Sequence, residues 1–226
     1  LDGLSKLEYR GYDSAGIAFI KDNGIEVIKK EGKIANLRKD VNFDVKSNLG
    51  IGHTRWATHG KATSSNAHPH RVGKITIVHN GIVENYDKLK ADLKNKGYEF
   101  KSETDTEVVA ALIDYVYKTE KDMLKTIRKV KEMLEGSYAL GIICDDEKDV
   151  LYTIKNKSPL IIGINDDEIE WVIFDEKDYI ENRFNGKMLM PSFVYQAQYK
   201  YGFCYINTKQ IYISTAAIMT SNVGDF

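Results

Sequence analysis

Cysteine, proline and long apolar segments are all scarce in this sequence of 226 residues. Two cysteines, Cys144 and Cys204, are too few for a disulfide framework, so we expect a protein of the reducing cytosol. Charged residues interrupt every apolar run before the roughly 20 residues that a membrane-spanning helix needs. Residues 1–10 lack the apolar stretch of a signal peptide. These absences exclude a disulfide-rich secreted module and a helical membrane protein.

An excess of charge of either sign is also missing. The formal net charge is -1, and lysines are mixed with acidic residues along the chain, which disfavours nucleic acid or an anionic membrane as the partner. Hydrophobic residues make up 42% and charged residues 29%, the ordinary balance of a globular enzyme with a sizeable core. No cofactor-binding motif stands out.

Hydrophobic periodicity predicts strands, then helices, then strands again. Expected strands are 15–20 and 25–28 around an Asn-Gly turn, 51–53, 75–78, 138–144, 150–154 and 160–164; expected helices are the tail over 1–10, one from 86 to Gly97, 104–117 and 122–134. That order favours an α+β layered fold. We therefore expect one domain over 1–165. Residues 166–226, with weak strand candidates at 170–174 and 211–213, form a divergent C-terminal segment that can complete the same domain.

Two polar motifs precede the expected strand 75–78. Residues 8–16 place Arg10 and Asp13 beside two glycines, where they either order a tight loop or face a ligand. Residues 53–60, HTRWATHG, contain Arg55, whose planar fork of donors suits a carboxylate. An ordinary half-buried loop remains the alternative for this second motif.

Neighbouring side chains could complete such a carboxylate site. Thr58 and His59 would add hydrogen bonds and Trp56 could cover a pocket. The clustered histidines also raise the question of zinc. However, His53, His59, His68 and His70 share no helix face, and no cysteine or carboxylate joins them, so the sequence predicts no metal site.

Two further motifs follow. His79-Asn80-Gly81 ends an expected strand, and an Asn amide beside a Gly N–H could form an oxyanion hole, although Asn-Gly is also a common turn. Residues 102–107, SETDTE, look like a helix cap, while Asp105 could bind an ammonium group. Together the motifs supply groups for binding the carboxylate and the ammonium of a free α-amino acid, and an oxyanion hole for attack on its side-chain carbonyl. A nucleophile is missing, because Cys144 falls in an apolar strand and Cys204 has no motif around it.

The segments EYRGYDSAGIA, HTRWATHG, HNGIVEN and SETDTEV resemble the class II, N-terminal-nucleophile glutamine amidotransferases. The domain that heads glucosamine-6-phosphate synthases is the most similar kind. This resemblance implies a four-layer αββα sandwich and hydrolysis of glutamine to glutamate and ammonia. It further implies ammonia transfer to fructose 6-phosphate on a sugar-isomerase domain, in a homodimeric protein without a cofactor.

The resemblance also implies roles for single residues. Arg55 binds the glutamine carboxylate and Asp105 its amino group, while Asn80 and Gly81 form the oxyanion hole. Thr58 and His59 match the loop that closes on glutamine, and Trp56 matches a gate on the ammonia path. Arg10 and His68 match positions that support the site.

One part of the family pattern is absent from the printed sequence. The family nucleophile is an N-terminal cysteine on an opening strand, whereas Leu1 already falls in the helix expected after that strand. We therefore expect a sandwich that is incomplete at its N-terminus and a 226-residue chain that does not hydrolyse glutamine by itself. Two alternatives remain open: a non-catalytic glutamine-binding remnant, and the glutaminase domain of another class II amidotransferase.

Overall fold

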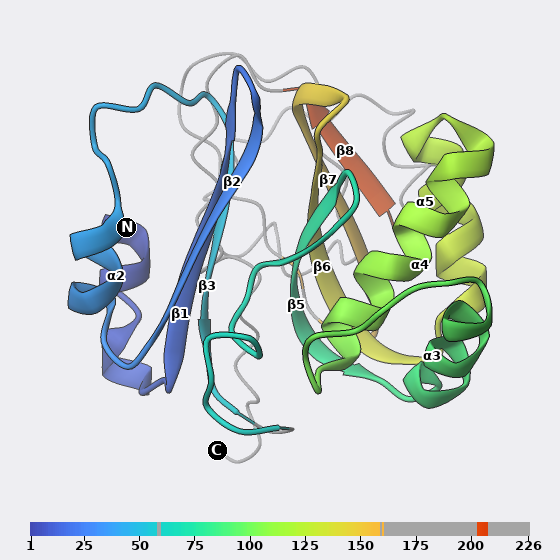
Figure 1. The fold of residues 1–226 in the computed structure, drawn as a ribbon, viewed down its shortest axis with the longest axis horizontal. Coiled ribbons are helices and arrows are strands. Elements are labelled where there is room, and N and C mark those ends of the chain that lie inside the picture. The colour runs from blue at the N-terminus through green and yellow to red at the C-terminus, as the bar shows by residue number, and fades with distance from the viewer. Residues whose placement is uncertain (58–59, 159, 161–202, 208–226) are drawn as a thin grey trace, which may run out of the picture.

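Two antiparallel sheets lie face to face, with helices on both outer sides (Figure 1). The computed structural model describes residues 1–57, 60–158, 160 and 203–207. The first sheet has the order β2-β1-β3 and the second the order β4-β5-β6-β7-β8. The strands are β1 (Ser14–Lys21), β2 (Gly24–Glu31), β3 (Gly50–Arg55), β4 (His70–Val72), β5 (Ile75–Val83), β6 (Gly136–Cys144), β7 (Glu147–Asn156) and β8 (Phe203–Asn207).

Helices cover the two outer faces unequally. The first sheet carries α1 (Asp2–Ser5), the 3₁₀ turn Glu8–Arg10 and α2 (Ile34–Asp40), and the second carries α3 (Tyr86–Asn95), α4 (Asp105–Glu120) and α5 (Met123–Met133). Among the residues that the structure describes, no helix has the length and apolar character needed to cross a bilayer.

Three apolar cores separate the four layers. The outer core of the first sheet contains Leu4 and Leu37, the middle core between the sheets contains Ile51 and Val78, and the core under the three long helices contains Ile113. Each sheet is therefore covered by an apolar core on both faces. The αββα sandwich expected from the sequence is confirmed.

Local signals explain much of this arrangement. The hairpin expected around Asn23-Gly24 is present, but its turn lies one residue earlier, at Asp22-Asn23, because Gly24 already pairs with Lys21 and adopts φ +114°. Helix α4 begins after Thr104, whose side chain accepts the N–H of Glu107, so the capping interpretation is confirmed.

One local signal is overridden. The strand β5 does not end at Val78 but runs on through Asn80 and Gly81, which lie opposite Ala139 and Tyr138 of β6. The turn interpretation of this dipeptide is therefore wrong, because both residues remain paired with β6.

Other expectations need smaller changes. The helical tail over 1–10 is divided between α1 and the 3₁₀ turn, and α2, β4 and β8 were not predicted. The strand β8, within the segment 166–226, pairs with β7. The strand candidates 170–174 and 211–213, and all of 160–164 except its first residue, lie outside the described residues.

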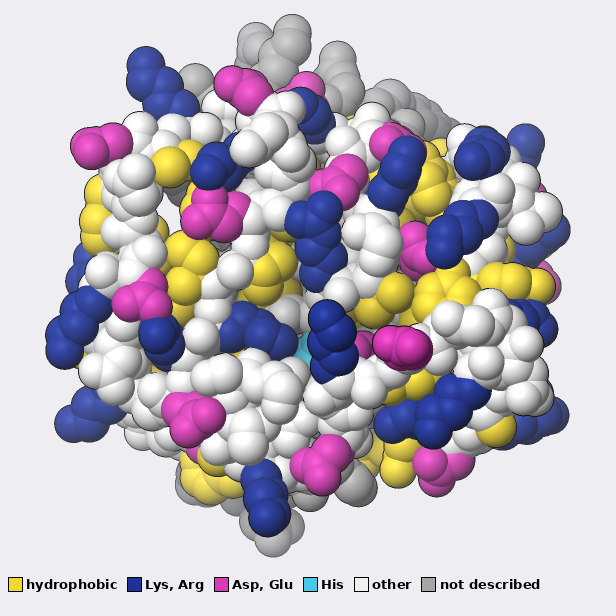
Figure 2. Space-filling view, viewed as in Figure 1, with side chains coloured by type: hydrophobic (Ala, Val, Ile, Leu, Met, Phe, Trp, Pro, Cys, Tyr) yellow, Lys and Arg dark blue, Asp and Glu magenta, His cyan; other side chains and the backbone are white. Residues whose placement is uncertain are grey.

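Basic and acidic side chains are interspersed over the face shown in Figure 2, and neither sign forms a continuous patch there. This surface agrees with the mixed charge pattern of the sequence.

Candidate active site

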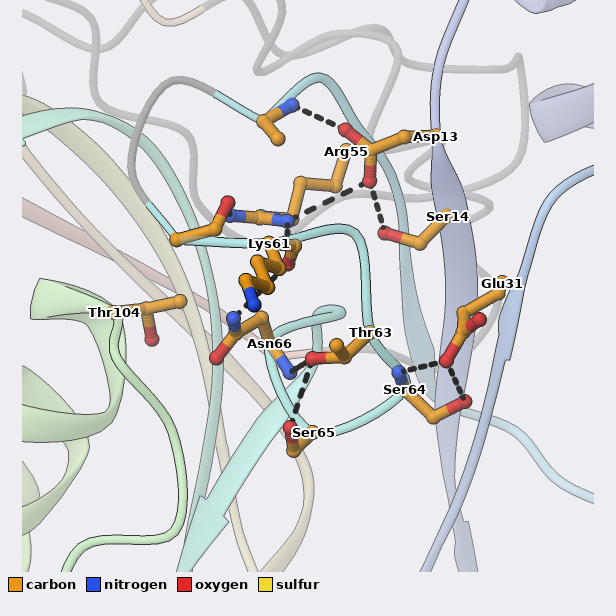
Figure 3. Close-up of polar contacts among 12 residues, drawn as sticks. Asp13, Ser14, Glu31, Arg55, Lys61, Thr63, Ser64, Ser65, Asn66 and Thr104 are labelled. Atoms are coloured by element: carbon orange, nitrogen blue, oxygen red, sulfur yellow. Dashed lines mark hydrogen bonds and ion pairs between the residues drawn. The ribbon is translucent and has the colours of Figure 1, made fainter.

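Arg55 is the last residue of β3, and its side chain is only 6% exposed. Its guanidinium lies 3.5 Å from the Asp13 carboxylate and donates to the carbonyl oxygens of Lys61 at 3.3 Å and Gly60 at 3.5 Å (Figure 3). A buried guanidinium needs such partners, because burying a charge without them is costly. The contacts fix the fork at the start of the loop that follows β3.

Asp13 links that loop to the segment 8–16. Its carboxylate accepts the Ser14 hydroxyl at 2.8 Å and the backbone N–H of Ala57, in addition to the ion pair with Arg55. Of the two interpretations left open for this segment, ordering of a loop is the one that the structure shows for Asp13. Arg10 lies three residues earlier, half-buried in the 3₁₀ turn.

Trp56 directly follows Arg55 and is 68% exposed. Its ring packs over Gly11, where an added Cβ would come within 3.0 Å of the indole. The two segments 8–16 and 53–57 therefore meet at this ring. Thr58 and His59 lie outside the described residues.

Asp105 opens α4, with its side chain 20% exposed. Its carboxylate accepts the Val83 N–H at 2.9 Å and the Thr106 hydroxyl at 3.3 Å, and lies 3.6 Å from Nδ1 of His79. Burial by itself raises the pKa of Asp105. The interaction with His79 and the hydrogen bonds from Val83 and Thr106 outweigh this effect and lower the pKa below its usual value. Asp105 is thus a fixed carboxylate that can pair with an ammonium group.

Asn80 and Gly81 lie on β5 between these two charged residues in the sequence. Oδ1 of Asn80 is 2.8 Å from Nε2 of His53, which projects from β3 in the facing sheet. Gly81 has φ +115°, and a Cβ there would lie 2.1 Å from the Ser137 carbonyl oxygen. No side chain can therefore replace this glycine without moving β6.

A polar clasp, Asn66 with Glu103, connects the loop after β3 to the start of α4. Asn66 is 1% exposed, and its Nδ2 donates to the Lys61 carbonyl oxygen and to the Glu103 carboxylate, both at 3.0 Å. In return, the Glu103 N–H donates to Oδ1 of Asn66 at 2.9 Å. Lys61 O also accepts from Arg55, and Glu103 is two residues from Asp105, so the clasp joins the segments that hold the two predicted ligand-binding charges.

Comparison with known proteins agrees with this arrangement. A family model described as "Glutamine amidotransferase domain" matches residues 53–174, more than half of the 226-residue chain. This chain belongs to the glutamine amidotransferase family. The matched range contains Arg55, Asn80, Gly81 and Asp105.

Curated relatives of this amidotransferase domain are named glutamine--fructose-6-phosphate aminotransferase [isomerizing]. The protein of Clostridium perfringens is 51% identical over 171 residues, covering 74% of this chain and 28% of the relative. That of Acinetobacter baylyi is 52% identical over 165 residues, covering 73% and 27%. The chain thus spans little more than a quarter of these relatives' length.

Solved structures give the same fold. The phosphoribosylpyrophosphate amidotransferase of B. subtilis, complexed with ADP and GMP, matches with a TM-score of 0.62 and 30% identity, covering 73% of this chain and 36% of that one. A structure described as the allosteric regulatory enzyme of purine biosynthesis matches with a TM-score of 0.63, also at 30% identity.

A row of buried histidines runs through the amidotransferase domain beside the site. The ring centroids of His53 and His68 are 4.4 Å apart, and those of His68 and His70 are 5.1 Å apart. Burial lowers the pKa of His53 to about 4 and that of His70 to about 3, so the row is uncharged at neutral pH. Within the described residues, no three His, Cys, Asp or Glu side chains are grouped to hold a metal ion.

The nucleophile is not supplied by Cys144. This thiol is completely buried in β6, and burial raises its pKa to about 11, so it stays protonated and inaccessible at neutral pH. The side chain of Cys204 lies outside the described part of the chain. The interpretation of Cys144 as a core residue is confirmed by its burial.

Sequence reasoning singled out Arg55, Asp105 and Asn80 as candidates, but it missed the Asn66–Glu103 clasp that joins the loop after β3 to the start of α4. Asn66 and Glu103 were not singled out as a pair, because they are 37 residues apart and neither has a distinctive local pattern. The polar composition of the loop was the only available signal.

Proposed function

We propose that this domain hydrolyses glutamine to glutamate and ammonia. The observation that carries the proposal is the pair of opposite charges, Arg55 and Asp105, held on segments that the Asn66–Glu103 clasp connects. A free α-amino acid offers the complementary carboxylate and ammonium groups. Two such contacts would fix glutamine and leave its side-chain amide near Asn80.

The proposed chemistry is acyl transfer to a thiolate. The thiolate attacks the side-chain carbonyl carbon, and the oxyanion accepts hydrogen bonds from the Asn80 amide and the Gly81 N–H. As the tetrahedral intermediate collapses, the base that took the thiol proton returns it to the departing nitrogen, so that ammonia leaves. Water then hydrolyses the thioester to release glutamate. The resemblance assigns the thiolate to an N-terminal cysteine whose α-amine is the base, a residue that the printed sequence does not include.

The remaining roles follow the same proposal. Thr58 and His59 close over glutamine, Trp56 gates the path of ammonia, and Arg10 and His68 support the site. In the whole protein, a sugar-isomerase domain would receive the ammonia and transfer it to fructose 6-phosphate, in a cytosolic homodimer. Identity near 50% to the fructose-6-phosphate aminotransferases, against 30% to the phosphoribosylpyrophosphate enzyme, supports this acceptor.

The experiment that tests the proposal replaces Arg55 in the complete protein. Arg55→Lys keeps the positive charge but removes the two-pronged fork, so KM for glutamine should rise roughly ten- to a thousand-fold with a smaller change in kcat. Arg38→Lys is the matched control, because Arg38 pairs with Asp2 on the surface at 2.6 Å. Unchanged glutamine affinity of the Arg55 variant in calorimetry would contradict the assignment.

A further inference from the structure

His53 connects the two sheets at the site. It projects from β3 and is 5% exposed, while Asn80 projects from β5 in the facing sheet. The 2.8 Å separation of His53 Nε2 and Asn80 Oδ1 makes a hydrogen bond between them. This bond joins residues 27 positions apart and involves the one side chain proposed to stabilise the oxyanion.

The direction of this bond follows from the state of the ring. Burial lowers the pKa of His53 to about 4, so at neutral pH the imidazole has one N–H and one bare nitrogen. Nδ1 is buried without a partner among the described residues. A proton on Nδ1 would leave a buried N–H unpaired, which is rarer and more costly than an unpaired lone pair. The proton therefore belongs on Nε2, which donates to Oδ1 of Asn80.

That direction decides what the Asn80 amide presents. With Oδ1 held by His53, the branch turned away from the imidazole is the donor Nδ2, whereas a flipped amide would place the acceptor Oδ1 there. A donor stabilises a developing oxyanion and an acceptor repels it. His68 helps to fix the imidazole, because the two rings contact each other with centroids 4.4 Å apart and planes inclined at 44°.

We propose that His53 is a positioning residue for the oxyanion hole: its Nε2–H holds the Asn80 amide with the donor toward the reacting carbonyl. This inference rests on the proposed glutaminase function. His53 itself contacts neither glutamine nor the nucleophile in the proposal; it acts only through Asn80.

The experiment compares His53→Gln with His53→Asn in the complete protein. Gln can place an amide N–H where Nε2 lies, whereas Asn is one methylene shorter and cannot reach Oδ1 of Asn80. We expect kcat for glutamate production to fall roughly ten- to a hundred-fold in His53→Asn, with KM within about threefold of the parent, and His53→Gln to recover most of the loss. Thr76→Val, another buried polar residue on β5, is the control and should leave kcat unchanged.

A double-mutant cycle separates positioning from a general structural role. Asn80→Ala should lower kcat by roughly a hundred-fold, and adding His53→Asn should lower it by no more than about another threefold, because the target of His53 is already gone. The inference would be overturned if the losses in kcat from Asn80→Ala and His53→Asn multiplied in the double variant. Equal turnover of His53→Gln and His53→Asn would also overturn it. A parent protein that does not hydrolyse glutamine would instead overturn the proposed function.

Discussion

Cys144 has the chemical group that the reaction needs, but its surroundings prevent it from reacting. The thiol lies in β6 with no exposed surface, and burial raises its pKa to about 11. A nucleophilic cysteine requires a lowered pKa and access to substrate. Whether a cysteine can act as a nucleophile thus depends on its burial. For Cys144, the local sequence indicates burial only through the apolar run around it.

Cys144→Ala should therefore leave glutamine turnover unchanged to within about twofold, while lowering stability by about 1 kcal/mol through the small cavity. Steady-state kinetics of the complete protein, with denaturant unfolding alongside, would measure both effects. A folded variant without turnover would make Cys144 the nucleophile and contradict the proposed mechanism.

Charged and polar residues of the candidate site were predictable where one side chain suggests one chemistry. Arg55 was singled out because a guanidinium fork suits a carboxylate, whereas Asp105 was first interpreted as part of a helix cap and took its ligand-binding role from the family resemblance. The partner relations were not predictable: Asp13 meets Arg55 because β1 and β3 pair in a register that places Ser14 opposite Arg55. Such pairs depend on the assembled sheets, and no short pattern encodes them.

At the scale of elements, prediction succeeded where periodicity was long and failed where elements were short. Helix α4 has 16 residues with most positions buried, and its cap and apolar face were both visible in the sequence. Helix α2 has only 7 residues, no side-chain cap, and two buried positions, Ile34 and Leu37. Its stability comes from packing on the first sheet and not from local propensity.

The buried histidine row gives the domain a dependence on pH. His53, His68 and His70 all have lowered pKa values, chiefly because burial disfavours the charged ring, with the positive charges of Arg55 and Lys29 adding to the effect. In the unfolded chain the same rings titrate near their ordinary value. Between the two values the unfolded state binds more protons than the folded state, so the free energy of unfolding falls as the pH falls.

Each such histidine should cost about 2 kcal/mol of stability between pH 7 and pH 5, before the carboxylates contribute much. His68→Phe retains an aromatic ring in the row but cannot be protonated. Denaturant unfolding at both pH values should show a smaller loss for His68→Phe than for the parent. Equal losses would show that the His68 ring is not kept neutral by the fold.

At the scale of the whole molecule, polar contacts join the sheets at both ends of the sandwich. The His53–Asn80 bond lies toward the end of the sandwich that carries the candidate site, where β3 finishes at Arg55. Near the opposite end of the first sheet, the tip of the β1–β2 hairpin lies beside the β6–β7 turn (Figure 1). There Oδ1 of Asp145 accepts the Ile25 N–H at 2.9 Å, and its Oδ2 pairs with Arg71 at 2.6 Å. We call these two contacts of Asp145 the tether.

Asp145 should therefore contribute to stability without affecting chemistry. It is 19% exposed and holds a backbone N–H of the other sheet as well as a guanidinium, so Asp145→Ala should lower the free energy of unfolding by about 1–3 kcal/mol. The matched control is Asp40→Ala, which removes a carboxylate that is 45% exposed and pairs with Lys30 at 2.7 Å. An exposed pair of that kind contributes about 1 kcal/mol or less.

Denaturant unfolding of both variants at neutral pH, together with kcat and KM for glutamine in the complete protein, would check this difference. We expect the loss of stability to be larger for Asp145→Ala, with both kinetic constants within about twofold of the parent because the tether lies far from Arg55 and Asn80. Equal losses in the two variants would mean that the tether adds nothing beyond a surface ion pair. A fall in kcat with stability retained would mean instead that the spacing of the sheets at the hairpin end controls the oxyanion hole.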